Sequence, residues 1–270
     1  MRNLILAIVV LSSLNFGSRL HAQEKVDLAK ELREIKSEIK GLKDEVAEVR
    51  EALNFILQIF ERSAADRMPV KDATIENPGA QIDDPSMGKI DAPVTMIEFM
   101  DYQCGYCAEF HQKILPEIKK ALIDTGKLRY VIMDFPLEMH AAAAPAASLA
   151  GCAAKQGKFW EIHDTLFKFP ESVADGKFEL VTSKVPEIDA TKLTTCLQGE
   201  EYRTTEKDGQ ILPGREAAED LAYGVALGIN STPSFVLYNS KQLGKEVKAK
   251  IVSGAQDPKV FSEIVDELSK

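Results

Sequence analysis

Cys104 and Cys107, separated by Gly105 and Tyr106, are the residues in this sequence best suited to do chemistry. The apolar run Val94–Met100 comes before them and is typical of a buried strand, and apolar residues at helical spacing come after them. We therefore expect Cys104 at a helix N-terminus, where free amides and the helix dipole stabilise a thiolate. Because a thiolate attacks disulfides, the pattern predicts thiol–disulfide exchange, with Cys107 one turn away and able to close on Cys104.

Strand and helix patterns follow this pair in a definite order. Residues 128–133, 234–238 and 249–253 are expected as strands, and Pro258–Leu268 as a closing helix. Helical patterns at 141–155, 159–169, 177–184, 189–197 and 213–227 occupy the stretch between the strands at 128–133 and 234–238. That stretch, roughly residues 139–222, is much longer than an ordinary loop. The order predicts an α/β catalytic domain over residues 91–270 with a helical insertion.

Pro233 is the second element with a chemical meaning. It lies between Thr232 and the strand expected at 234–238, and a proline without an N–H donor is restricted to a strand start or edge. A Thr-Pro pair alone is usually part of a loop. Combined with the cysteine pair after the first strand, it indicates a thioredoxin fold, in which this proline is cis and packs against the two cysteines. The backbone before it is then free to pair with an extended substrate, so we expect Thr232, Pro233, Gly105 and Tyr106 to form a substrate-binding surface.

From about residue 84 to 269 the chain resembles the DsbA-like family of exported thiol–disulfide oxidoreductases, which have a thioredoxin fold. The matching blocks are residues 92–94, 98–104, 134–137, 156–164 and 228–235. The resemblance implies that Cys104 is the exposed nucleophile, that Cys107 is the buried resolving thiol, and that no cofactor is bound. It also implies that Glu98 is buried beneath Cys107, where an acid could shuttle a proton. The alternative, a solvated or salt-bridged Glu98, fits an apolar run less well.

Cys152 and Cys196 remain once the closely spaced pair is set aside. An even number of cysteines suits an oxidising compartment, so we expect a structural disulfide between them, with two buried free thiols as the alternative. Members of the family that the sequence resembles often carry a second cysteine pair in the insertion, which supports the disulfide.

The histidines give no separate signal of catalysis. Cys104, Cys107 and His111 have a spacing that imitates part of a metal site, but a fourth ligand is not evident, and structural zinc sites use four. We therefore expect no metal, and we interpret His111, His140 and His163 as structural or surface residues.

Residues 1–22 have the features of a cleaved signal peptide. Arg2 precedes an apolar run at residues 4–14, and Leu20-His21-Ala22 is a passable cleavage site. The run is shorter than the ~20 residues that span a bilayer, so we expect export to the periplasm rather than an anchor. The formal net charge is -9 and no basic cluster is present, which argues against nucleic-acid binding.

Residues 28–60 carry a strict seven-residue apolar repeat, which is typical of a coiled coil, and we expect an oligomerisation helix over residues 23–62. The g positions hold glutamates and the e positions hold lysines or an arginine, so opposite charges meet in a parallel arrangement and like charges meet in an antiparallel one. We expect a parallel homo-oligomer; the alternative, one helix folded back on its own domain, would drift off a strict repeat. The residues are Leu32, Ile39, Val46, Leu53 and Phe60 at a, Leu28, Ile35, Leu42, Val49 and Ile56 at d, Glu31, Glu38 and Glu45 at g, and Lys36, Lys43 and Arg50 at e.

The pattern determines the number of helices in this coiled coil less firmly than their parallel orientation. Ile35, Val49 and Ile56 at d disfavour a dimer, and the apolar Leu57 and Ile59 widen the buried face near the end. A trimer is favoured over a dimer. Prolines and glycines scattered over residues 63–90 indicate a linker followed by a strand that leads into the catalytic domain.

Three functions fit these observations. We favour a disulfide isomerase or reductase, kept reduced by a DsbD-like membrane reductase, because Gly105-Tyr106 and Thr232 resemble those of DsbC-type isomerases and because an oligomer gathers several thiols around one client. The N-terminal helix adds a resemblance to the suppressor-of-copper-sensitivity protein C group. The alternative is a DsbA-type dithiol oxidase, recharged by a DsbB-like oxidase. A copper or zinc carrier that uses the two thiolates is the third candidate.

Overall fold

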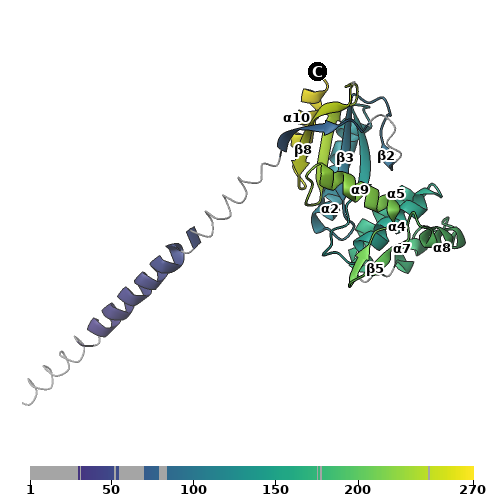
Figure 1. Ribbon diagram of the computed structural model, residues 1–270. Coiled ribbons are helices and arrows are strands. Elements are labelled where there is room, and N and C mark those ends of the chain that lie inside the picture. Colours follow the sequence, from purple (N-terminus) through teal and green to yellow (C-terminus); the bar gives the residue numbers. More distant parts are fainter. Residues whose placement is uncertain are drawn as a thin grey trace, which may run out of the picture. The chain divides into compact units, whose positions relative to one another are not determined.

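The computed structural model describes residues 30, 32–51, 53–54, 70–78, 84–174, 176, 178–242 and 244–270 (Figure 1). The chain forms two compact units, Met1–Asp66 and Arg67–Lys270. The expected signal peptide at residues 1–22 lies outside the described residues. Within the described ranges, no helix combines the length and the apolar character needed to cross a membrane.

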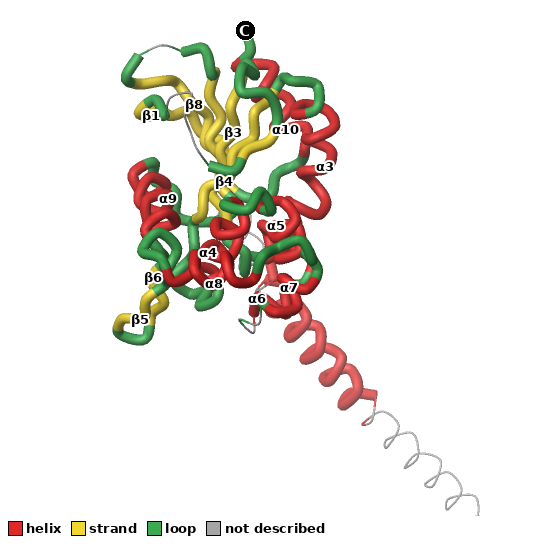
Figure 2. The backbone as a smooth tube through the Cα atoms, turned by 90° about the vertical axis from the view of Figure 1, so that its right-hand side faces the viewer, coloured by secondary structure: helices red, strands yellow, loops and turns green. Residues whose placement is uncertain are grey.

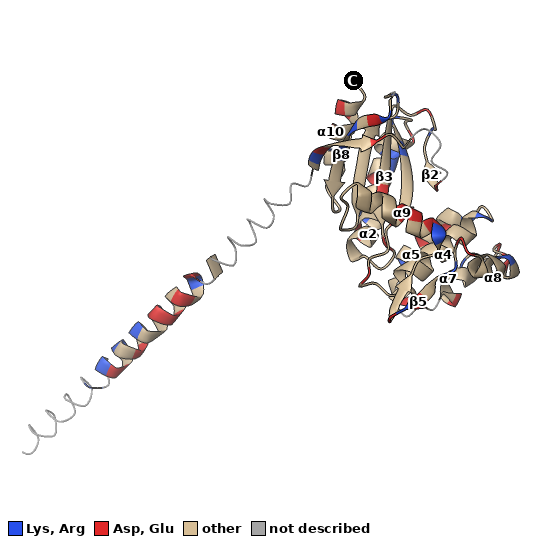
Figure 3. Ribbon diagram, in the orientation of Figure 1, with Lys and Arg blue, Asp and Glu red and all other residues tan. Residues whose placement is uncertain are grey.

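Residues 30, 32–51 and 53–54 form one helix, here called the N-terminal helix. Charged side chains occur along it in both signs (Figure 3). The apolar residues of the seven-residue repeat are 47–69% exposed in the single chain, namely Leu32, Ile35, Ile39, Leu42, Val46, Val49 and Leu53. Leu28, Glu31, Ile56, Leu57, Ile59 and Phe60 lie outside the described residues, and the coiled coil stays a prediction.

A six-stranded sheet organises the second unit, in the order β1-β8-β7-β3-β4-β2. β3 and β4 are parallel neighbours inside the sheet and every residue of both is buried, as their largely apolar sequences predict. All other neighbouring strands are antiparallel. The strands are β1 (Val70–Glu76), β2 (Ser86–Met87), β3 (Val94–Met100), β4 (Leu128–Asp134), β7 (Ser234–Asn239) and β8 (Glu246–Ser253).

Helices cover both faces of this sheet (Figure 2). One face carries the long helical stretch that follows the cysteine pair together with the closing helix, and Phe110, Phe235 and Phe261 pack there with ring centroids 4.5 to 5.8 Å apart. The other face carries α9 (Arg215–Ala226), where Gly224 permits close approach, because a Cβ there would lie 2.7 Å from the Phe135 ring. The first face is covered by α2 (Gly105–Glu109), η1 (Phe110–Ile114), α3 (Leu115–Ile118), η2 (Lys119–Ile123) and α10 (Pro258–Leu268).

The helical insertion lies between β4 and β7, as the sequence predicts. Its first helix is rich in alanine and buried along most of its length, because small side chains let neighbouring helices pack closely. The elements are α4 (Ala143–Ala154), α5 (Phe159–Lys168), α6 (Pro170–Ala174), α7 (Glu179–Ser183), α8 (Ala190–Gln198) and the hairpin of β5 (Thr205–Lys207) and β6 (Gln210–Leu212). α6 and the hairpin had no counterpart in the sequence patterns.

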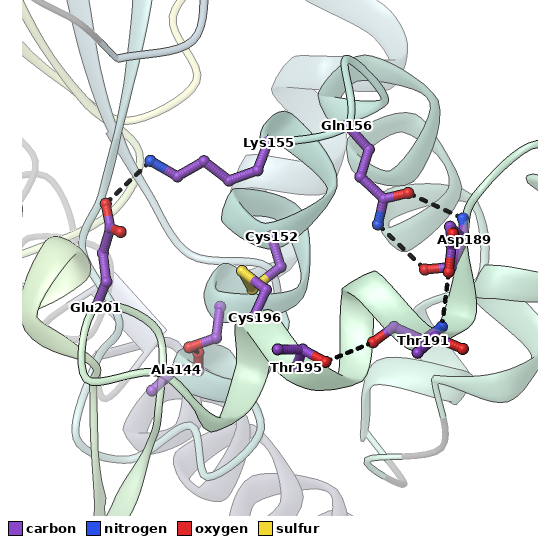
Figure 4. Close-up of a disulfide and its surroundings, with 10 residues drawn as sticks. Ala144, Cys152, Lys155, Gln156, Asp189, Thr191, Thr195, Cys196 and Glu201 are labelled. Carbon is purple, nitrogen blue, oxygen red and sulfur yellow. Dashed lines mark hydrogen bonds and ion pairs between the residues drawn. A yellow bond between two sulfur atoms is a disulfide. The ribbon is translucent and has the colours of Figure 1, made fainter.

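A disulfide joins Cys152 on α4 to Cys196 on α8, with an S–S distance of 2.05 Å (Figure 4). Beside it, the Gln156 amide donates to the Asp189 carbonyl and accepts from the Asp189 amide, at 3.2 and 2.9 Å. Asp189 also caps α8, since its carboxylate accepts from two amides of the first turn. The disulfide and the Gln156–Asp189 hydrogen bonds tie α8 to the end of α4.

The segment at residues 63–90 contains more structure than a linker and one strand. β1 and β2 both fall within it. β1 is an edge strand that pairs antiparallel with β8, and Ile75 is its only fully buried residue. Because an edge strand buries so little, its sequence carries only a weak strand signal.

Candidate active site

Cys104 occupies the N-cap of α2 with extended backbone angles, φ -74° and ψ 118°. Its carbonyl accepts the amide of Ala108 at 3.1 Å, so the helix begins directly after the cysteine. The amides of the first turn are left free to face the sulfur, which favours a negative charge there. Only 7% of Cys104 is exposed.

The Thr232–Pro233 peptide bond is cis and brings the loop before β7 against Cys104. In its protonated form, the Cys104 thiol donates to the carbonyl of Thr232 at 3.3 Å. The Pro233 carbonyl accepts the amide of Gly254 at 2.8 Å, which fixes this loop to the end of β8. The expected contact between the cysteine pair and the Thr-Pro loop is therefore present in the structure.

The four residues expected at the substrate-binding surface differ in exposure. Tyr106 is 68% exposed, and a Cβ placed on Gly105 would meet no atom within 4 Å, so the start of α2 faces open space. Thr232 is buried, and its hydroxyl has no hydrogen-bond partner among the residues that the structure describes.

The environment shifts the pKa values of the two thiols in opposite directions. A hydrogen bond from Cys107, followed by Thr232 and the amides of Cys107 and Tyr106, lowers the pKa of Cys104 from 9.0 to about 5, against the opposing effect of burial. Burial raises the pKa of Cys107 well above its ordinary value, and Cys104 and the charge of Glu98 add to the effect. Near neutral pH these shifts favour a thiolate at Cys104 and a protonated thiol at Cys107, and the thiolate is the form of a cysteine that attacks disulfides.

Glu98 lies in the middle of β3 with no exposed surface, opposite Phe235 of β7 and Ile132 of β4 in the strand register. The hydroxyl of Tyr130 donates to Glu98 Oε2. His111 Nε2 lies 3.3 Å from Glu98 Oε1. The charge of Glu98 raises the pKa of Cys107, and Glu98 is a buried acid beside His111 rather than a solvated strand residue.

Two histidines extend a series of polar contacts from Glu98 into the interior of the protein. His111 Nδ1 lies 3.1 Å from His163 Nε2, and His163 Nδ1 lies 2.9 Å from the hydroxyl of Tyr102. Burial, with a smaller effect of His111, lowers the pKa of His163 well below its ordinary value, so His163 is neutral. Sequence reasoning missed this chain of contacts: His111 follows Cys107 by one turn, but His163 is on α5, and only the fold brings the two together.

His140 has a different role near the same loop. Its Nδ1 lies 2.8 Å from Asp101 Oδ2, which also accepts the amide of Leu137 at 2.8 Å. The other oxygen of Asp101 accepts the amide of Gln103 at 2.7 Å. Asp101 thereby holds the turn that leads into Cys104, and His140 supports it.

Carboxylates gather at a second place in this unit. Oxygens of Asp84, Glu216 and Asp220 lie within 4.8 Å of one another, and Asp220 Oδ2 accepts the amide of Asp134 at 2.9 Å. Burial, with the neighbouring charges of Asp84 and others, raises the pKa of Glu216 to about 7 and that of Asp220 to about 8. At pH 7 Glu216 is then about half protonated and Asp220 is mostly protonated, and proton retention is how buried carboxyls avoid uncompensated charge.

The paired thiols, the cis-proline beside them and the buried acid belong to the class of dithiol sites carried on a thioredoxin fold. The sequence model of the family described as thioredoxin matches residues 80–267, and the chain belongs to this family. The expected α/β thioredoxin-like fold with a helical insertion is confirmed.

Known proteins resemble parts of the chain. It is 34% identical over 119 residues to "Disulfide bond formation protein D" of Bacillus subtilis, covering 43% of this chain and 51% of that protein. It is 41% identical over 80 residues to "Na(+)/H(+) antiporter NhaA 3" of Salinispora tropica, covering 29% of this chain but 12% of that protein. The chain thus spans about half the length, or less, of these curated relatives.

A solved structure supports the fold over a longer range. The crystal structure of Wolbachia pipientis alpha-DsbA1 matches with a TM-score of 0.55 at 24% identity, covering 70% of this chain and 92% of that one. That of Pseudomonas aeruginosa DsbA2 matches with a TM-score of 0.51, also at 24% identity. These likenesses concern the thioredoxin-like unit and say nothing of the N-terminal helix.

Proposed function

We propose that this protein is a thiol–disulfide oxidoreductase that donates a Cys104–Cys107 disulfide to exported client proteins. The observation that carries the proposal is that the pKa values of the two thiols shift in opposite directions: that of Cys104 is lowered to about 5 and that of Cys107 is raised. A strongly stabilised thiolate favours the reduced pair, and a pair that prefers to be reduced is a good oxidant. The likeness to DsbA structures and to a protein named for disulfide bond formation agrees with it.

The proposed reaction is two exchanges at sulfur. A client thiolate attacks Cys104 Sγ of the oxidised pair, the bond between the two cysteines breaks, and Cys107 leaves and takes up a proton. A second client thiolate then attacks the client sulfur of the mixed disulfide, and Cys104 leaves as its stabilised thiolate. The client is oxidised by two electrons and the pair is reduced. In this proposal the backbone of Thr232 pairs with the client and Tyr106 flanks it.

A disulfide isomerase is the second candidate, because the N-terminal helix presents an apolar stripe that is 47–69% exposed in one chain. In this alternative the helices of several copies form a parallel coiled coil, preferably a trimer, as the charges at e and g favour. Such an assembly places several Cys104 thiolates around one misfolded client. The partner would be a DsbD-like reductase, whereas the oxidase would be recharged by a DsbB-like protein. Either activity belongs in the periplasm, after removal of residues 1–22.

Two assays with residues 23–270 separate these activities. The oxidised protein is mixed with a reduced client that has one disulfide, and the reduced protein is mixed with a scrambled client that has several. An oxidase converts the first client rapidly and rescues the second poorly, and an isomerase does the reverse. Removal of residues 23–62 abolishes isomerase activity but leaves oxidation intact. If Cys104→Ser processed both clients as well as the original protein, both candidate functions would be refuted.

A further inference from the structure

The segment after β4, residues 137–142, here called the post-β4 loop, presents a methionine to solvent. Met139 is 82% exposed, which is the largest exposed fraction of any large apolar side chain among the residues that the structure describes. A single exposed apolar residue is common on protein surfaces and needs no explanation by itself. What distinguishes Met139 is that its loop is fixed beside the cysteine pair.

Three contacts fix the post-β4 loop to the turn at 101–103, directly before the first cysteine. In each contact a side chain of the turn meets a group of the loop, on one side of Met139 or the other. The contacts are Leu137 N to Asp101 Oδ2 at 2.8 Å, His140 Nδ1 to Asp101 Oδ2 at 2.8 Å, and Ala142 N to Gln103 Oε1 at 2.6 Å. A loop that is already held at both ends has less backbone freedom to lose on binding, which favours it as a docking site.

The two segments that adjoin the post-β4 loop also carry exposed apolar side chains. The turn at 101–103 leads through the first cysteine into α2, whose Tyr106 is 68% exposed. The side chain of Glu138 accepts a hydrogen bond from the side-chain amide of Gln210 on β6, and the next residue, Ile211, is 39% exposed. Exposed apolar side chains therefore occur on three connected segments, and one of them is two residues from the cysteine that reacts.

We propose that Met139, with Tyr106 and Ile211, binds apolar side chains of an extended client segment while a thiol of that client reacts at Cys104. The inference rests on the proposed exchange function. It extends the substrate-binding surface that the sequence predicts to the post-β4 loop and to the hairpin of β5 and β6. Met139 takes no part in the exchange at sulfur, so it is a residue that determines which clients bind well.

The nature of the occupant follows from the position of the loop. A client that reacts at Cys104 brings its neighbouring residues close to the turn at 101–103, because an extended chain rises only ~3.3 Å per residue. The post-β4 loop is bonded to that turn, so it lies within reach of side chains a few residues from the reacting client cysteine. Clients that still lack their disulfides expose apolar side chains, and a methionine adapts its flexible, polarisable side chain to partners of different shape.

The test uses the oxidised protein, residues 23–270, and two synthetic client peptides. The peptides have the same two cysteines and differ only two to four residues from the first one, where one peptide carries leucines and the other serines. Each reaction forms the disulfide of the peptide and reduces the Cys104–Cys107 pair by two electrons. Rapid mixing, quenching with acid and mass spectrometry give the rate over a range of peptide concentrations, from which the half-saturating concentration and the maximal rate are separated.

Met139→Gln is the decisive variant, because glutamine has a similar length but a polar end. We expect it to raise the half-saturating concentration of the leucine peptide about fivefold, as the loss of a partly buried apolar contact does, and to leave the maximal rate within about twofold. The serine peptide and reduced glutathione offer no apolar side chain to the loop. Both should react with the variant as they do with the original protein.

Ile90→Gln is the matched control, because Ile90 is also strongly exposed, at 71%, but precedes β3, whereas the cysteine pair follows that strand. The seven residues of β3 separate its two ends by about 20 Å. Ile90→Gln should oxidise both peptides as the original protein does. Both substituted side chains are exposed, so circular dichroism should find both variants folded.

Equal half-saturating concentrations of the leucine peptide in Met139→Gln and the original protein would overturn the inference. An equal rise in Ile90→Gln, or an equal rise with the serine peptide, would overturn it as well, and each of these results leaves the exchange function intact. Failure of the original protein to oxidise either peptide and to react with glutathione would instead refute the exchange function itself.

Discussion

The acidity of Cys104 depends most on Cys107, which is the first cause of its lowered pKa of about 5. Replacing Cys107 by alanine removes this hydrogen bond and leaves Thr232 and the amides of the first turn. A hydrogen bond to a charged group is worth about 1.5–3 kcal/mol, and one pH unit corresponds to about 1.36 kcal/mol. We therefore expect the pKa of Cys104 to rise from about 5 to about 6–7 in Cys107→Ala.

Cys107→Ser is the matched comparison, because a serine hydroxyl still donates to the thiolate. Its Cys104 should keep a pKa within about one unit of the original. The assay is the rate of alkylation by iodoacetamide as a function of pH, with the product quantified by mass spectrometry. Only one thiol reacts in either variant, because Cys152 and Cys196 are joined to each other. Equal pKa values in the alanine and serine variants would refute the assignment of Cys107 as the dominant donor.

Three further results are expected. Because folding lowers the pKa of Cys104 from 9.0 to about 5, its stabilising effect is full above pH 9 and is lost as the pH falls through about 5. Unfolding by guanidinium should show that the stability of the reduced form, relative to the oxidised form, falls by about 2 kcal/mol between pH 7 and pH 5. Replacing Cys152 and Cys196 by alanine should cost about 4 kcal/mol in urea unfolding, from the chain entropy of a 44-residue separation, while the alkylation rate of Cys104 stays unchanged. The pKa of Asp220 is raised from 3.8 to about 8, so its contribution to stability is present below pH 4 and lost as the pH rises through 8. Asp220→Asn, which can still accept the Asp134 amide, should reduce this fall in the free energy of unfolding with pH. Identical slopes of the free energy of unfolding against pH in the two proteins would contradict the burial argument.

Much of the site follows from short-range sequence patterns. The apolar run at Val94–Met100, the helical spacing after Cys107 and the proline before an apolar strand each predict one element correctly. They place Cys104 at a helix start and Thr232 beside it because the thioredoxin fold fixes how such elements meet. Glu98 could be singled out because a glutamate is unusual within a largely apolar run.

What the sequence could not supply depends on pairs of residues far apart in the chain. His111 and His163 meet only because α5 of the insertion packs beside the helical stretch that follows the cysteines. β1 joins the sheet only because β8, far along the chain, offers it an edge. Neither partner carries a periodic signal that points to the other. The π-helical turns of η1 and η2 likewise follow no apolar spacing that differs from an ordinary helix.

In the proposed function Cys104 exchanges disulfides with other proteins, and the same chain holds a disulfide of its own between Cys152 and Cys196. Cys152 has no exposed surface and Cys196 is only partly exposed, so an incoming thiolate has no open path to the inner sulfur. Of the two sulfurs of this bond, that of Cys196 is therefore the one that a thiolate from another copy of the chain would have to attack.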